Sequence, residues 1–216
     1  MSGFKMQRFK RWCGQACILM VILTSVIFVT IMSTFILYPI DAHIQQLPEL
    51  ENMPLGRLYH NYVQLMAFLH FPWLTQLRMM DFPSSLNGIA HFRDVKQLFI
   101  LNDLLMLVLV PLAIHIWRKW RRTGQLWQLK LPFQMGFLVP IMVALAASIN
   151  FDRFFITFHH LFFRNRNWLF DPSTDPIINV LPESFFSHCF ILAFVLFEAA
   201  MLLGLYRIKH VSDLKK

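Results

Sequence analysis

The sequence predicts an all-α integral membrane protein with four transmembrane helices and two helical extracytoplasmic segments. Apolar residues make up 56% of the 216 residues and charged residues only 15%, against about 45–50% and about 25% in soluble domains. Four stretches also reach the length of about 20 mostly apolar residues that a membrane-crossing helix needs. These observations exclude an intrinsically disordered chain and argue against a soluble globular protein.

The predicted spans cover residues 16–38, 98–117, 131–150 and 186–206. The first span is longer than the apolar core of a signal peptide, and no small-residue cleavage site follows it. We therefore interpret it as a helix that is retained in the mature protein. With one short connection and two longer ones between the spans, residues 1–216 are expected to form a single membrane domain.

The distribution of basic residues predicts the orientation. Thirteen of the 20 Lys and Arg residues flank the spans on one side, at Lys5, Arg8, Lys10, Arg11, Arg118, Lys119, Arg121, Arg122, Lys130, Arg207, Lys209, Lys215 and Lys216. Because basic loops stay in the cytoplasm, both termini are predicted to be cytoplasmic. The net charge of +8 is therefore attributed to a membrane surface, and no nucleic-acid partner is expected.

Two longer segments, residues 39–97 and 151–185, are predicted to lie outside the membrane on the extracytoplasmic side. Residues 56–69 carry apolar residues at helical spacing, and Ser84 or Ser85 can cap the helix that leads into the second span. Residues 151–163 are rich in Phe and predict a helix that either lies in the membrane interface or continues the third span. Six of the nine histidines lie in these two segments, so any chemistry is expected there.

Two histidine motifs are candidate sites. His91 and Asp94 lie one helical turn apart, and a carboxylate at that spacing can hold an imidazole in one tautomer. The alternative is an ordinary surface pair at a membrane boundary. His159 and His160 are adjacent, so on a helix their side chains diverge by about 100° and only one can face a given site.

A metal site could be assembled on paper from His91, His159, Asp171 and Asp175. No close Cys/His spacing or His-Glu-x-x-His motif supports it, so neither a metal nor a cofactor is expected. Asp103 and Glu198 lie within the predicted spans, where an ionisable group marks either a function or hydrogen bonding between helices.

Two blocks of sequence together resemble a known family. The first contains Asn61-Tyr62, Phe82-Pro83-Ser84-Ser85 and Gly88-Ile89-Ala90-His91-Phe92-Arg93-Asp94-Val95-Lys96-Gln97-Leu98-Phe99. The second contains Phe158-His159-His160-Leu161-Phe162-Phe163, Trp168, Asp171-Pro172, Asp175 and Leu181-Pro182-Glu183. These blocks resemble the four-span bacterial integral membrane family that contains the lipoprotein intramolecular transacylase. The resemblance covers essentially the whole chain.

The resemblance implies an acyltransferase of the bacterial cell membrane whose substrate is a diacylated lipoprotein among the membrane lipids. The enzyme would move the sn-2 acyl chain of the diacylglyceryl group to the α-amine of the N-terminal cysteine, which gives a lyso-form lipoprotein. His91 and His159 would be the catalytic residues, by acid/base chemistry or through an acyl-histidine. Which of His159 and His160 faces the site stays open.

The remaining site residues have supporting roles. These residues are Arg93, Asp94, His160, Asn165, Trp168, Asp171 and Asp175. We expect Asp94 to orient His91, and Asp171 or Asp175 to orient His159. Arg93, Asn165 or a backbone N–H is expected to stabilise the oxyanion of the tetrahedral intermediate.

The implied chemistry agrees with the residue types. A histidine can accept the proton that an attacking amine must lose and return it to the leaving oxygen. Transfer from an ester to an amide is downhill, so it needs no ATP-binding motif. Two other functions remain open: a non-catalytic lipid-binding or lipoprotein-binding membrane protein, and a small transporter that uses Asp103 and Glu198.

Overall fold

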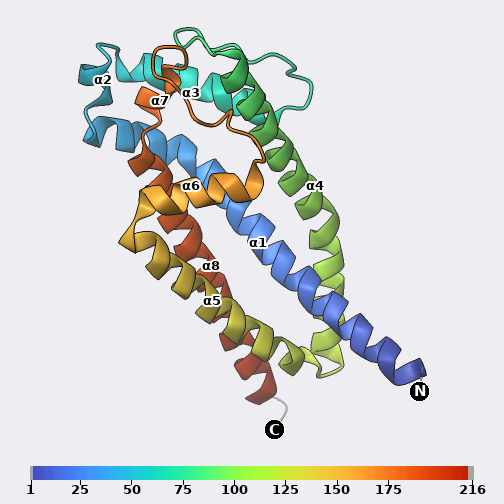
Figure 1. Ribbon diagram of the computed structural model, residues 1–216. Helices are drawn as coiled ribbons and strands as arrows, with labels where there is room; N and C mark the ends of the chain where they lie inside the picture. The colour runs from blue at the N-terminus through green and yellow to red at the C-terminus, as the bar shows by residue number, and fades with distance from the viewer. Residues whose placement is uncertain (1, 214–216) are drawn as a thin grey trace. The chain divides into compact units, whose positions relative to one another are not determined.

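The computed structural model describes residues 2–213 as a set of helices joined by turns and loops (Figure 1). In chain order they are α1 (Ser2–Ile44), α2 (Leu47–Leu50), α3 (Leu55–His70), α4 (Leu86–Arg122), the 3-10 helix η1 (Leu126–Leu129), α5 (Lys130–Ile149), α6 (Phe151–Phe162), α7 (Ile177–Val180) and α8 (Glu183–Asp213). Four helical stretches in this part of the chain are long and apolar enough to cross a membrane: Lys5–Ile44, Leu86–Arg122, Leu126–Ile149 and Glu183–Val211. The prediction of an all-α protein with four spans is confirmed.

The longest helices extend well beyond the spans that the sequence predicts. α1 has 43 residues and α4 has 37, or about 65 Å and about 55 Å at the rise of an α-helix. The hydrocarbon core of a bilayer is only about 30 Å thick. Hydropathy marks where apolar residues stop, whereas the helix continues through polar residues until a turn ends it. The added length of α4 includes His91.

Contacts divide the chain into two compact units. Among the described residues, unit 1 comprises 2–29, 103–148 and 191–213, and unit 2 comprises 30–102 and 149–190. Because α1, α4 and α8 each contribute to both units, the expected single membrane domain stays a prediction. The basic residues that predict the orientation all belong to the unit 1 ranges, except that Lys215 and Lys216 lie outside the described residues.

The core of unit 2 is built around stacked aromatic rings. Tyr38 of α1 and Tyr62 of α3 stack with centroids 4.2 Å apart, and Phe185 of α8 contacts both rings edge-on. The Tyr62 hydroxyl donates a hydrogen bond to Thr34, so the buried phenol has a polar partner. These contacts join α1, α3 and α8 within the unit.

The long loop between α3 and α4 is fastened at both ends. Near its start, the Lys96 ammonium donates hydrogen bonds to the carbonyls of Phe71 (2.8 Å) and Leu74 (2.6 Å). Near its end, Asp81 accepts hydrogen bonds from Arg57 and from Asn61 of α3. The segment that leads into α4 is therefore held in place before the site helix begins.

The helices of unit 1 approach one another closely at small residues. A Cβ atom added at Gly204 of α8 would lie 2.0 Å from the Phe133 ring of α5. A Cβ atom at Gly14 of α1 would lie 2.7 Å from the Trp120 ring of α4. Small residues allow such contacts between membrane helices, where packing rather than the hydrophobic effect drives association.

Candidate active site

The two histidines of the family-like blocks lie side by side in unit 2. His91 is on α4 and His159 is on α6; their side chains are 7% and 8% exposed. Their ring centroids are 5.8 Å apart. The structure thus brings together residues that are 68 positions apart in the sequence, while the neighbouring His160 is exposed. His159, not His160, faces His91.

The position of His159 depends on where α6 begins. α5 ends at Ile149, and Asn150 adopts an extended conformation whose side chain caps α6 by accepting a hydrogen bond from the Arg153 N–H (2.8 Å). α6 is therefore a separate helix and does not continue the third span; α5 ends one residue before the end at 150 that the sequence predicts for that span. The short helix is strongly amphipathic, and His159 is its buried residue.

Aromatic side chains enclose the histidine pair. The His91 ring contacts Phe163 and Phe170, with centroids 4.9 and 5.5 Å away. The His159 ring lies 4.1 Å from Phe155 and 4.7 Å from Trp168. Such a cage keeps water away, which strengthens electrostatic interactions at the imidazoles.

One hydrogen bond assigns the tautomer of His159. Its Nδ1 lies 2.8 Å from the Phe155 carbonyl, one helical turn earlier. Since a carbonyl can only accept, Nδ1 carries the proton and donates it. In the neutral ring the lone pair is then on Nε2. Burial lowers the pKa of His159 from its usual value near 6.5, so the ring is neutral at pH 7.

His91 has an unsatisfied polar atom. Its Nδ1 is buried and has no hydrogen-bond partner among the described residues. A buried polar group without a partner costs about 1–3 kcal/mol, and such groups in native structures call for an explanation. A substrate atom that hydrogen-bonds to this nitrogen would provide one.

Asp94 does not orient His91 as the sequence suggested. Its carboxylate accepts a hydrogen bond from the Asn165 amide (2.9 Å), and the Asn165 carbonyl in turn accepts one from the Trp168 indole (3.1 Å). Asp94 thereby fastens the segment after α6 to α4 and holds Trp168 against His159. The same bond engages the Asn165 amide that was expected to bind an oxyanion.

Asp171 and Asp175, which were expected to orient His159, form hydrogen bonds with other residues. Asp171 accepts hydrogen bonds from the backbone N–H and hydroxyl of Ser173 (2.9 and 2.7 Å) and closes a local turn. Asp175 is 3% exposed and accepts a hydrogen bond from the Ser85 N–H (2.8 Å) at the start of α4. A backbone carbonyl, rather than either aspartate, orients His159.

The other candidates lie outside the cage. Arg93 is exposed and is two residues from His91, which on a helix places it on a different face. His160 contacts Trp168 edge-on, with centroids 5.3 Å apart. Asp103 and Glu198 belong to unit 1. No group of three or more His, Cys, Asp or Glu side chains within residues 2–213 could hold a metal ion.

Sequence reasoning missed two parts of the site. The Phe155 carbonyl could have been found, because it lies four residues before His159 and a helical histidine can reach that carbonyl. Phe170 had no such signal, and the block that contains Phe163 did not show its contact with His91, because both residues flank an irregular segment that Asn165 fastens to Asp94.

Comparison with known proteins gives consistent matches. A family model described as lipoprotein intramolecular transacylase Lit matches residues 13–186. The solved structure of the membrane-integral lipoprotein intramolecular transacylase Lit from Bacillus cereus is 25% identical, with a TM-score of 0.87 and 98% of each chain covered. Two further structures of that protein carry a histidine-to-arginine and a histidine-to-alanine substitution. Both are 24% identical to this chain, with TM-scores of 0.76. Each match covers 99% of this chain, and 97% of the arginine variant or 98% of the alanine variant. No curated protein sequence matches the chain.

Proposed function

Because the chain belongs to the lipoprotein intramolecular transacylase family and is therefore an acyltransferase, we propose that it transfers the sn-2 acyl chain of a diacylated lipoprotein to that lipoprotein's own N-terminal amine. The donor is the ester at the sn-2 oxygen of the diacylglyceryl group on the N-terminal cysteine. The acceptor is the α-amine of the same cysteine. The product is a lyso-form lipoprotein with one N-linked and one O-linked chain.

The observation that carries this proposal is the pair of buried imidazoles. The His91 and His159 rings are 5.8 Å apart in an aromatic cage, and the described protein leaves Nδ1 of His91 without a partner. A buried imidazole nitrogen without a partner can bond to a reacting group directly, whereas a surface histidine is already hydrogen-bonded to water. An apolar cage also suits a substrate whose reacting ester lies next to an acyl chain.

We assign proton transfer to His159. The neutral amine attacks the sn-2 carbonyl carbon, a C–N bond forms, and Nε2 of His159 accepts an N–H proton. The C–O bond to glycerol then breaks, and the glycerol oxygen takes that proton. An ester and an amine thus become an amide and an alcohol, with no net gain or loss of protons.

We assign His91 to stabilising the negative charge that develops on the oxygen of the attacked carbonyl. A neutral imidazole carries one N–H donor, and a donor aimed at developing negative charge in a dry site can contribute about 3–4 kcal/mol to catalysis. The donor and acceptor groups belong to one molecule, so holding them in a near-attack geometry supplies a further large factor. The site is proposed to be extracytoplasmic, because the basic residues that flank the spans predict a cytoplasmic side and both histidines lie in the two segments between the spans that are predicted on the opposite side.

Tandem mass spectrometry of a lipoprotein N-terminus tests the function. The chain is expressed in a bacterium that makes diacylated lipoproteins but lacks this activity, beside the same host with an empty vector. We expect an N-acyl, mono-O-acyl lipopeptide at the mass of the di-O-acyl form, distinguished from it by fragmentation. An unchanged di-O-acyl product from well-expressed protein would favour the lipid-binding or transport alternative.

The pH dependence of the rate follows from the lowered pKa of His159. A reference α-amine has a pKa of about 7.7–8.0, so protonation of the substrate should cost about tenfold per pH unit below that value. Since burial lowers the pKa of His159 below 6.5, loss of the base adds a second factor of about ten per unit only below pH 6.5. The measurement is the transacylation rate with a synthetic diacylated lipopeptide in detergent, between pH 5 and about 9. This range covers both the loss due to the amine and the loss due to His159. A second break above pH 6.5 would contradict a buried neutral base.

A further inference from the structure

The end of α4 carries a cluster of cations that transacylation does not use. His115, Arg118, Lys119, Arg122 and Thr123 line an open cavity of about 380 Å³ in unit 1. The side chains of Arg118, Lys119 and Arg122 are exposed, and none of the three forms an ion pair with a described residue. The lining contains no carboxylate. This cavity therefore favours an anion.

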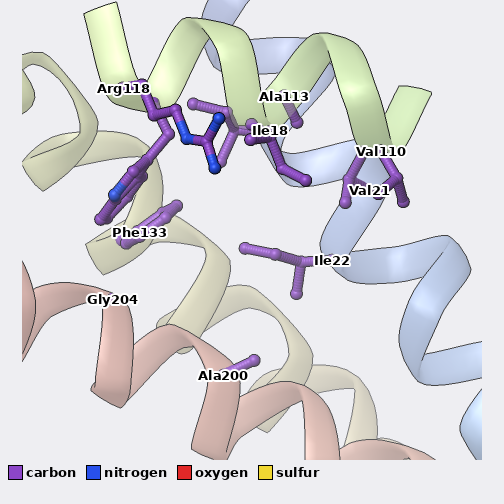
Figure 2. Close-up of a pocket in the computed structure, with 11 residues that line it drawn as sticks. Ile18, Val21, Ile22, Val110, Ala113, Arg118, Phe133, Ala200 and Gly204 are labelled. Atoms are coloured by element: carbon purple, nitrogen blue, oxygen red, sulfur yellow. The ribbon is translucent and has the colours of Figure 1, made fainter. Parts of the chain in front are cut away.

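A second cavity meets the first at Arg118. It has a volume of about 330 Å³ and is lined by α1, α4, α5 and α8 of unit 1. Its lining side chains are apolar apart from Arg118. Figure 2 shows Ile22, Phe133 and Ala200 around this space, with the Arg118 guanidinium at its edge. The two cavities together thus offer a hydrocarbon site next to a cationic one.

We propose that unit 1 binds an anionic diacyl phospholipid of the surrounding membrane. Its phosphate contacts Arg118 and Arg122, and one of its acyl chains occupies the apolar cavity. Basic pockets between membrane helices are suited to anionic headgroups. Trp117 lines the apolar cavity beside Arg118, and tryptophan favours the headgroup level of a bilayer. A water-soluble anion would use the cations but leave the apolar cavity without an occupant.

This lipid is distinct from the acylated substrate. Every residue that lines the two cavities belongs to unit 1, whereas His91 and His159 belong to unit 2. The bound lipid is a structural ligand that stabilises the packed helices of unit 1 by mass action, because it binds the folded form.

Native mass spectrometry of the full chain tests the headgroup. The protein is released from detergent with equal amounts of phosphatidylglycerol and phosphatidylcholine that have the same acyl chains. We expect preferential retention of phosphatidylglycerol, reduced about fivefold for each cation removed in Arg118→Gln and Arg122→Gln. The double variant Lys130→Gln/Arg207→Gln removes as many charges as Arg118→Gln/Arg122→Gln does, but outside both cavities, and should keep the preference. Equal retention of the two lipids by the unmodified chain would overturn the proposal.

A second pair of variants tests the acyl chain. Ala200 lines the apolar cavity, so Ala200→Leu should fill part of it and lower phosphatidylglycerol retention severalfold. Ala199 is exposed and does not line the cavity, so Ala199→Leu is the matched control. Thermal unfolding without lipid checks that each variant folds. If inorganic phosphate displaces the lipid and Ala200→Leu has no effect, the cations bind phosphate alone and the lipid site is wrong.

Discussion

His159→Ala is expected to lower the transacylation rate by about 10²–10⁴-fold, the range that general acid–base catalysis contributes. The change removes Nε2, the nitrogen that we propose accepts the amine proton. His159→Gln should lose about as much, because an amide can hydrogen-bond to the Phe155 carbonyl but is not a base at neutral pH. The measurement is the fraction of lyso-form lipopeptide formed with time, by tandem mass spectrometry at matched expression.

The adjacent histidine supplies the matched control. His160 is exposed and contacts Trp168 edge-on rather than the other imidazole, so His160→Ala should change the rate by no more than about twofold, in line with other surface substitutions. The two variants remove the same side chain from neighbouring positions of one helix. Equal losses in both would mean that α6 as a whole, rather than the His159 imidazole, matters for activity.

The helices could be predicted from the sequence because their signals are local. Ser85 was one of two expected caps for the second span's helix, and its hydroxyl does accept a hydrogen bond from the Gly88 N–H (3.0 Å). The helix expected at residues 56–69 appears as Leu55–His70. Hydropathy alone marks only the apolar stretch of the second span's helix, from residue 98, whereas α4 itself begins at Leu86, next to the expected cap.

The supporting contacts of the site could not be predicted in the same way. His91 and His159 were candidates from local patterns, and the family resemblance assigned them as the catalytic residues, but their surroundings depend on contacts between distant residues. Asn165 and Asp94 are 71 positions apart, and Asp175 and Ser85 are 90 apart. No spacing rule connects such pairs, so nearby aspartates were assigned to the histidines when they instead fasten the loop after α6.

Gly88→Ala is expected to destabilise the protein by about 1–3 kcal/mol, the usual range for overpacking, and to lower activity with it. A Cβ atom at Gly88 would lie 2.1 Å from the Asp175 carboxylate oxygen. The same oxygen accepts the hydrogen bond from the Ser85 N–H. The methyl group would push Asp175 off the start of α4, one turn before His91. Thermal unfolding in detergent should show a midpoint roughly 3–10 °C lower.

Two comparisons separate this clash from a general effect of alanine. Gly56 lies in the first turn of α3 with no atom within 4 Å of an added Cβ, so Gly56→Ala should stabilise the protein by up to about 1 kcal/mol through helix propensity. In an Asp175→Ala background the clashing carboxylate is absent, and Gly88→Ala should then cost little. Such non-additivity is the mark of residues in direct contact. A full loss in that background would show that the backbone at Gly88, rather than its contact with Asp175, excludes a side chain.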